Sequence, residues 1–157
     1  MTALSANIDR PVRIPPGGIR TAKVKLAGYT NRAGGNVAFT CYKGAVIACD
    51  ITDTDGYFGP MDFNAATGDI FGGIAMSKQA VTSVDTADGS VEITVAINGT
   101  WGFPVGGCAI TDLGAIAYAS DDGTITPASS NALNIGTIVD VDATYVWVEL
   151  AWMKLTA

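Results

Sequence analysis

The sequence predicts an all-β fold, a small barrel or sandwich of short antiparallel strands with an extended N-terminal arm. The chain of 157 residues is 48% hydrophobic but only 15% charged, below the roughly 25% of an ordinary globular domain. Short runs rich in Val, Ile, Thr and aromatic residues recur along it, and Gly, Asp, Asn or Pro bounds each run. The length suits one domain, so we expect an arm over residues 1–20 and a β domain over residues 21–157.

The first 20 residues differ from the rest of the chain. They contain three prolines, two of them adjacent, which favours an extended path and excludes a helix. Residues 1–32 carry six basic residues and one acidic residue, a net charge of +5, whereas residues 33–157 carry three basic and 14 acidic residues, a net charge of −11. A basic arm on an acidic body predicts contact with a neighbouring subunit, and the alternative is a frayed terminus that happens to be basic. The residues expected to make the contact are Arg10, Pro11, Arg13, Pro15, Pro16 and Arg20.

Several strands are expected in the first half of the body. Residues 21–27 alternate, with the apolar side chains on one face and two lysines on the other. Residues 36–42 and 45–49 predict a hairpin around Lys43-Gly44. Residues 68–76 predict a strand that Gly72-Gly73 interrupts, where a bulge or a close backbone approach is expected. The polar residues 77–89 predict a loop or one irregular turn.

The second half of the body, from Val91 to Leu150, predicts four further strand-like runs. Its alternation is strictest over 145–150, which puts Tyr145, Trp147 and Glu149 on one face of a strand. Asp121-Asp122-Gly123 predicts a tight hairpin, because Gly tolerates the positive φ of such turns. We expect Trp101, Phe103 and Trp147 in core or inter-subunit packing, with ligand binding as the alternative for the first two. The runs are 91–104, 114–120, 123–127 and 134–150.

No set of residues typical of catalysis is apparent. The chain has no histidine, which excludes the Ser-His-Asp and Cys-His pairings. Its three cysteines include no C-x-x-C pair, so we expect neither a zinc ribbon nor a redox motif but buried free thiols in a reducing compartment. We therefore predict that the protein is not an enzyme and that it has no metal and no other cofactor.

The most suggestive metal motif is the acidic stretch from Asp50 to Gly56. Set against the twelve-residue calcium loop, Asp53 and Asp55 fill the third and fifth places, but the first falls on Ile51, which offers no side-chain oxygen. The twelfth place falls on Asp62 rather than on a bidentate Glu. A turn is therefore the favoured interpretation here, and also for the other two Asp-Gly clusters.

Composition also excludes several classes of partner. The arm has no aromatic residue for base stacking before Tyr29, and the acidic body repels phosphates, so nucleic-acid binding is not expected. No apolar run approaches the roughly 18 residues of a membrane span. The N-terminus lacks the apolar core of a secretion signal, so we do not expect secretion.

Five motifs follow one another in a characteristic order. They are Gly72-Gly-Ile-Ala-Met76, a strand ending in Asn98-Gly-Thr-Trp-Gly-Phe-Pro104, a strand and Asp-Gly turn over 114–126, Asn134-Ile-Gly-Thr-Ile138, and Val146-Trp-Val-Glu-Leu150. This order resembles the small capsid decoration, or cement, proteins of tailed bacteriophages. The resemblance covers residues 68–151 and leaves residues 1–35 outside it.

The resemblance implies a non-enzymatic structural protein on the outer surface of the virion capsid. Such a protein would be assembled in the host cytoplasm, form a homo-oligomer, most simply a trimer, and bind the major capsid protein to stabilise the shell. The arm would then clamp an adjacent capsid or decoration subunit, and deletion of residues 2–20 should weaken attachment without unfolding the body. Two alternatives stay open. One is another phage component, a head-fibre base or tail tube subunit; the other is a carbohydrate-binding β module using Trp101, Tyr118, Tyr145 and Trp147.

Overall fold

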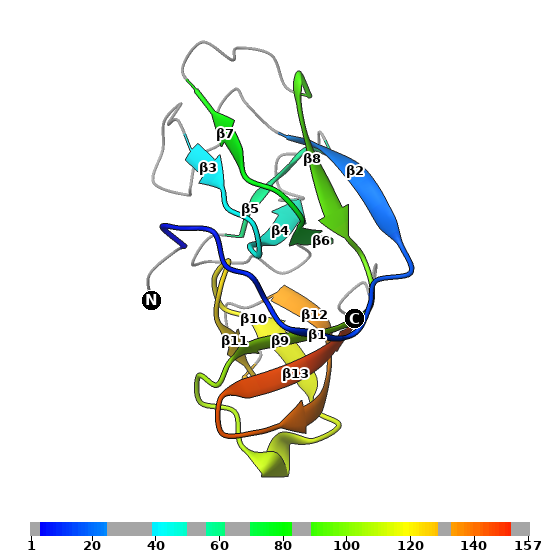
Figure 1. Cartoon of the computed structure of the whole chain (residues 1–157), viewed down its shortest axis with the longest axis vertical. Coiled ribbons are helices and arrows are strands. Elements are labelled where there is room, and N and C mark those ends of the chain that lie inside the picture. Colours follow the sequence, from blue (N-terminus) through cyan, green and yellow to red (C-terminus); the bar gives the residue numbers. More distant parts are fainter. Residues whose placement is uncertain are drawn as a thin grey trace.

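Thirteen strands and one short 3-10 turn make up the described part of the chain, which confirms the all-β class (Figure 1). The structure is a computed structural model, and it describes residues 4–24, 39–49, 56–61, 70–82, 89–128 and 133–151. The elements are β1 (Val12–Ile14), β2 (Ile19–Val24), β3 (Phe39–Cys41), β4 (Val46–Cys49), β5 (Phe58–Pro60), β6 (Ile70–Ala75), β7 (Gln79–Val81), β8 (Val91–Ala96), β9 (Thr100–Pro104), η2 (Ile110–Asp112), β10 (Ile116–Ala119), β11 (Ile125–Thr126), β12 (Leu133–Val141) and β13 (Tyr145–Leu150).

A closed barrel occupies the upper half of the molecule in Figure 1, with strand order β2-β5-β4-β6-β8. All its pairs are antiparallel except β2 with β5, which run parallel at Val24 and Phe58. The alternation predicted from residue 21 is confirmed as far as the structure describes it, because Ala22 and Val24 are buried and Lys23 is exposed. Apolar side chains of β2, β4 and β8 thereby fill the barrel interior.

A six-stranded antiparallel sheet forms the lower half, with strand order β1-β9-β13-β12-β10-β11. Phe103, Ile138 and Val148 lie fully buried on its inner face. Val46, Phe71 and Ile74 of the barrel belong to the same hydrophobic cluster, so the sheet and the barrel share one core. The alternation predicted for β13 is confirmed for its even-numbered residues, which are all buried.

The run predicted over 91–104 is two strands in two different units. β8 pairs within the barrel and β9 pairs within the sheet, with a turn at 97–99 between them where Gly99 has φ of +98°. The run over 134–150 is likewise a hairpin of β12 and β13. Its turn is stabilised by Asp142, whose Oδ1 accepts hydrogen bonds from the amides of Thr144 and Tyr145, both at 2.8 Å.

The hairpin predicted around Lys43-Gly44 is wrong. The turn exists, with Gly44 at φ of +85°, but β3 pairs with β7 whereas β4 pairs with β5 and β6. The amide of Gly44 donates to the carbonyl of Ala75 at 2.8 Å, which directs the chain into the barrel instead of back along β3. The strand β7 also lies within residues 77–89, where the sequence predicted a loop.

The break at Gly72-Gly73 in β6 is confirmed. The register with β4 shifts there, and Gly73 has φ of +131°. A β carbon at Gly73 would lie 2.7 Å from the carbonyl oxygen of Ala96, so the barrel backbones approach each other too closely for a side chain.

The Asp121-Asp122-Gly123 hairpin is confirmed, but the reason given for it is wrong. β10 and β11 pair antiparallel across it, while Gly123 is not among the glycines with positive φ. The turn is held by the carboxylate of Asp121, whose Oδ1 accepts from the amides of Gly123 and Thr124 at 2.8 and 2.6 Å. The turn predicted at the acidic stretch from Asp50, including Asp53 and Asp55, and the position of Asp62 lie outside the described residues.

Candidate functional site

The N-terminal segment lies along its own body and joins the barrel to the sheet. We call residues 4–18 the strap (the blue ribbon that crosses the centre of Figure 1). On the barrel side, the amide of Ile8 donates to the carbonyl of Lys43 at 2.9 Å. On the sheet side, β1 pairs with β9, and the amide of Gly102 donates to the carbonyl of Pro11 at 2.8 Å. The strap is therefore part of the folded body.

Arg10 anchors the strap, and only 7% of its surface is exposed. Its Nε donates to the carbonyl of Gly44 at 2.5 Å and its Nη2 donates to the carbonyl of Gly123 at 3.4 Å. The guanidinium carbon lies 4.1 Å from the centre of the Phe103 ring, a cation–π contact. One side chain of the strap thus reaches the barrel, the β10–β11 hairpin and the sheet core.

Two carboxylates share this enclosed space with Arg10. Asp121 is 0% exposed and Asp122 is 2% exposed, and Asp122 Oδ1 accepts the amide of Leu4 at 2.8 Å. Burial raises the pKa of Asp122 to about 6, although the Leu4 amide and Arg10 oppose the shift. Burial also lowers the pKa of Arg10 to about 10, and the two carboxylates counteract part of that effect. Within the described structure, Arg10 Nη1 and Asp121 Oδ2 have no hydrogen-bond partner.

A second arginine of the strap lies on the outer face of the sheet. The Arg13 guanidinium carbon is 3.9 Å from the centre of the Trp147 ring, and Arg13 forms ion pairs with Asp140 and, at 3.4 Å, with Asp142. The pKa of Asp140 is lowered mainly by its bond to Arg13, and that of Asp142 mainly by the Trp147 Nε1 donor at 2.7 Å. Arg13 explains why Trp147, on the outward face of β13, is only 7% exposed.

Several of the residues predicted to contact another subunit contact their own chain instead. Arg10 is buried, Arg13 covers Trp147, and the guanidinium carbon of Arg20 lies 4.8 Å from the centre of the Phe58 ring. Pro11 packs near Gly102, where a β carbon would lie 2.7 Å from its ring; Pro15 is exposed and Pro16 half-buried. A contact of this segment with another subunit stays a prediction.

The expectation that residues 2–20 can be deleted without unfolding the body does not fit the structure. The deletion would remove β1 and the buried Arg10, together with Ile19 and Arg20, the first two residues of β2. Those two residues pair with Ala96 and Val95 of β8, so the barrel would lose part of a strand pair as well. We expect the truncated chain to lose stability, not only attachment.

Trp101, Phe103 and Trp147 pack inside this chain, at 6%, 0% and 7% exposure. Sugar binding needs an aromatic ring with an exposed face, which neither tryptophan offers. The carbohydrate-binding alternative therefore loses two of its four aromatic residues. Of the other two, Tyr118 and Tyr145 are half-buried.

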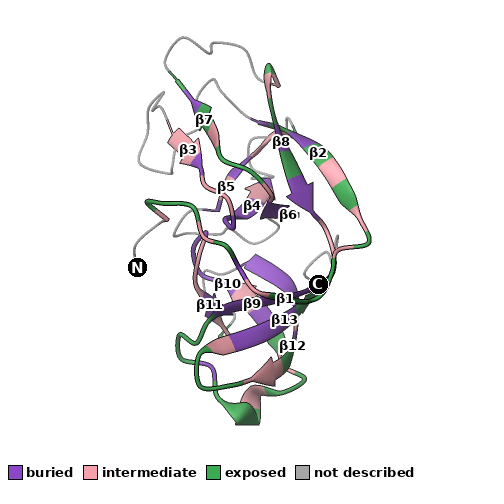
Figure 2. Ribbon diagram, in the orientation of Figure 1, coloured by how far each residue is buried: buried purple, intermediate pink, exposed green. Residues whose placement is uncertain are grey.

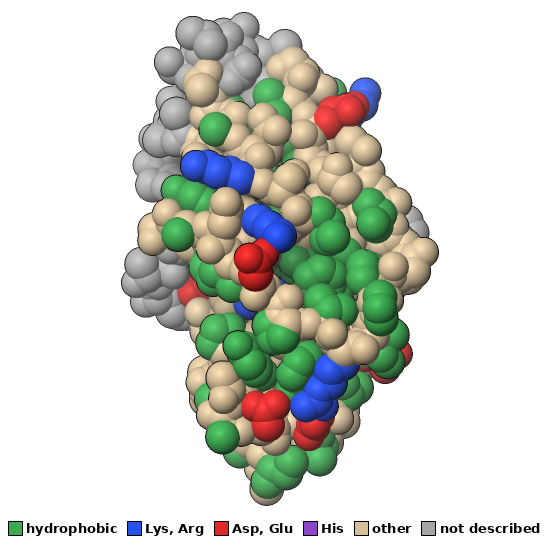
Figure 3. All heavy atoms as spheres, in the orientation of Figure 1, with side chains coloured by type: hydrophobic (Ala, Val, Ile, Leu, Met, Phe, Trp, Pro, Cys, Tyr) green, Lys and Arg blue, Asp and Glu red, His purple; other side chains and the backbone are tan. Residues whose placement is uncertain are grey.

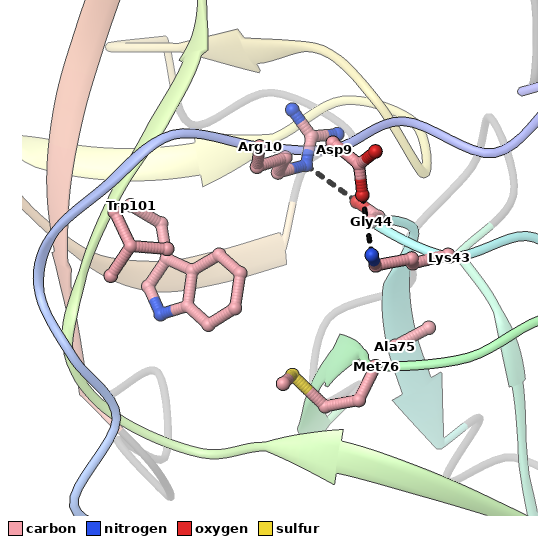
Figure 4. Close-up of a pocket in the computed structure, with 8 residues that line it drawn as sticks. Asp9, Arg10, Lys43, Gly44, Ala75, Met76 and Trp101 are labelled. Carbon is pink, nitrogen blue, oxygen red and sulfur yellow. Dashed lines mark hydrogen bonds and ion pairs between the residues drawn. The ribbon is translucent and has the colours of Figure 1, made fainter.

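A small hollow opens beside the strap, with a volume of about 180 Å³ (Figure 4). Val12, Ala75, Met76 and Trp101 contribute apolar surface, and the ion pair of Asp9 with Lys43 lies at one side. The hollow brings together no nucleophile with a base and no pair of free carboxylates, so its chemistry suits packing and not catalysis.

Four exposed apolar residues lie on or next to η2, β10 and β12, at the end of the molecule farthest from the barrel. Figure 2 shows exposed backbone at this end, and Figure 3 shows hydrophobic side chains there as well as across the middle of the molecule. We call these four residues the apolar tip: Ile110, Leu113, Ile116 and Val139, with exposures of 59%, 48%, 43% and 41%. The backbone beneath them is well bonded, since the amide of Gly114 donates to the carbonyl of Ile138 and the amide of Ile138 donates to that of Ala115, both at 2.9 Å. Hydrogen bonds thus fix the backbone of the apolar tip. Sequence periodicity did not reveal this surface, because Ile110 and Leu113 lie outside the strands.

The cysteines and the acidic residues are the groups that could form a redox or metal site. Cys41, Cys49 and Cys108 are buried, as predicted, and burial raises the pKa of Cys41 to about 12. The residues described include no cluster of three or more Cys, Asp or Glu side chains that could hold a metal ion. They also include no helix that is long and apolar enough to cross a membrane.

Comparisons with protein-family models, curated proteins and solved structures found no match for this chain.

Proposed function

We propose that the chain is a structural protein that binds the outside of an assembled phage head and stabilises the shell. Its partners would be the major capsid protein and further copies of itself in a symmetric oligomer. Support comes from the five ordered motifs of residues 68–151, which lie on β6, on β8 with β9, on β10 with β11, on β12 and on β13. The body they form is all-β, and the described residues show no reactive site.

The observation that carries the proposal is the apolar tip. Exposed apolar groups on neighbouring elements mark interaction surfaces, because their contact with water is unfavourable. The hydrogen bonds between residues 114–115 and 138 hold this surface in place, and a pre-organised surface loses little entropy on binding. In a symmetric oligomer each copy presents the same tip, so several weak contacts act together. We assign the tip to contact with the capsid.

Co-sedimentation with phage heads tests the proposal. The purified protein is mixed with expanded, undecorated heads built from the major capsid protein encoded with it, beside unexpanded shells. We expect saturable binding to expanded heads only. Binding to neither form contradicts the proposal, and self-assembly into rings or tubes without heads would instead indicate a tail or fibre component.

Substitutions at the apolar tip test the surface. We expect the double variant I110D/L113D to bind expanded heads at least about tenfold more weakly, because it places two unpaired carboxylates in an apolar contact that excludes water. The control is V105D, which introduces one such carboxylate at another exposed apolar residue, 39% exposed and outside the tip. If the double variant and the control bind alike, the tip is not the contact surface.

A further inference from the structure

The enclosed space beneath the strap holds an unbalanced set of charges. Asp121 and Asp122 bring two carboxylates and Arg10 brings one guanidinium, all three buried. When both carboxylates are ionised, one negative charge lacks a counter-charge away from water. Such an arrangement is unfavourable, and the uptake of one proton neutralises it.

No other described group facing this space supplies the missing charge. From the side of the barrel, the Cys41 thiol lies near Asp122, but its raised pKa of about 12 keeps it neutral. Lys43 is in the adjacent turn, where its ammonium pairs with Asp9 at the surface. From β9, Phe103 contributes an uncharged ring. The net charge of this space is therefore set by Arg10 and the two aspartates.

Residues of the strap separate this space from solvent. Leu4 packs over the hairpin, since a β carbon built on Gly123 would lie 2.9 Å from Leu4 Cδ2, and the Leu4 amide donates to Asp122 Oδ1. Arg10 closes the side next to Phe103. Detachment of the strap would open Asp122 to water and remove its burial. The protonation of Asp122 and the position of the strap are thus coupled.

We propose that this cluster is a proton-operated latch, in which uptake of one proton by Asp122 tightens the strap against the body and loss of the proton loosens it. A loosened strap frees a basic, Pro-containing segment for contact with another molecule, and a tightened strap withdraws it. The latch is a property of the single chain and is separate from the proposed binding to heads.

The sign follows from the pKa of Asp122. With the strap docked the pKa is about 6, and with the strap detached we expect the ordinary carboxyl value of 3.8. The docked state therefore binds the proton more tightly, so docking strengthens as the pH falls through about 6 and levels off below 4. A difference of about two pKa units corresponds to about a hundredfold change in the docking equilibrium. Asp140 has the opposite effect on docking of the strap. Its pKa is lowered by the bond to Arg13, so acidification that protonates Asp140 removes this bond and weakens docking.

Amide hydrogen exchange of the purified chain between pH 8 and pH 4 tests the latch, with rates corrected for the intrinsic pH dependence of exchange. The amide of Ile8 is the reporter, because it donates from the strap to the body. We expect its protection to begin rising near pH 6 and to be tens of fold higher at pH 4. Protection that is constant or that falls on acidification would overturn the proposal.

Two variants separate the latch from general effects of charge. D122N keeps an oxygen acceptor for the Leu4 amide but cannot ionise, so the Ile8 amide should be as protected at pH 8 as the parent is at pH 4, with no rise in protection below pH 6. D140N removes one of the two exposed partners of Arg13 and should lower protection at pH 8 while keeping the rise below pH 6.

If D122N does not fold, a carbon-13 titration of the parent's Asp122 carboxyl decides: a midpoint near 4 contradicts the latch. Because these measurements use no heads, their failure would leave the proposed function untouched.

Discussion

Replacement of Arg10 by alanine should lower the free energy of unfolding by about 3 kcal/mol or more at pH 7.5. The substitution leaves Asp121 and Asp122 without a cation in a buried space, and loss of one partner from a buried charged cluster costs about 3–5 kcal/mol. It also removes the donors to the carbonyls of Gly44 and Gly123 and the contact with Phe103. Urea unfolding followed by tryptophan fluorescence measures the change.

Arg13 provides the matched control in the same strap. Its side chain is 43% exposed and pairs with exposed carboxylates, so R13A should cost less than about 1 kcal/mol. R10K keeps the charge but not the planar group that reaches two carbonyls and stacks on Phe103, and should recover only part of the loss. Equal costs for R10A and R13A would show that Arg10 does not anchor the strap.

Replacement of Gly44 by alanine should detach the strap from the barrel. Gly44 has φ of +85°, and a β carbon there would lie 2.5 Å from the carbonyl oxygen of Ile8. The clash involves backbone, so no change of rotamer relieves it; the strap itself must move. We expect G44A to lower the free energy of unfolding and to abolish the protection of the Ile8 amide from exchange.

G114A isolates the contribution of the close approach. Gly114 has a similar φ of +82°, but nothing lies within 4 Å of the position of its β carbon. Its substitution should therefore cost only the left-handed backbone strain, about 1–2 kcal/mol. G44A should cost about 1–3 kcal/mol more, the usual range for overpacking. If the two variants are equally stable, the strap does not pass close to Gly44.

The sequence alone predicts the fold class and several local features of single strands correctly. The alternation of β13, the inward Ala22 and Val24, and the break at Gly72-Gly73 depend on side chains near one another in the chain. Pairing partners depend on distant contacts. Nothing local shows that β3 pairs with β7 instead of β4, or that 91–104 divides between two units at 97–99, because both sides of each break have the composition of strands.

At the candidate site, too, the sequence did not reveal contacts between residues that are far apart in the chain. The excess of basic residues in residues 1–32 was visible in the sequence, but its explanation was not. Arg10 donates to the carbonyl of Gly123, which is 113 residues further along the chain, and no spacing rule connects residues so far apart. The Asp121-Asp122-Gly123 sequence predicts a turn, which the structure confirms. A turn motif does not reveal that both carboxylates are buried beside an arginine.

One measurement tests directly whether the strap docks on its own chain. A sample is prepared by unfolding and refolding isotope-labelled protein with an excess of unlabelled protein, and nuclear Overhauser contacts are recorded between the Arg10 side chain and the Phe103 ring. We expect the contact only between groups of the same labelled chain, at the short distance given by the 4.1 Å separation of the guanidinium carbon from the ring centre. A contact between labelled and unlabelled chains would show that the strap docks on a neighbour, and the absence of any contact would show that Arg10 is not buried; either result contradicts this account.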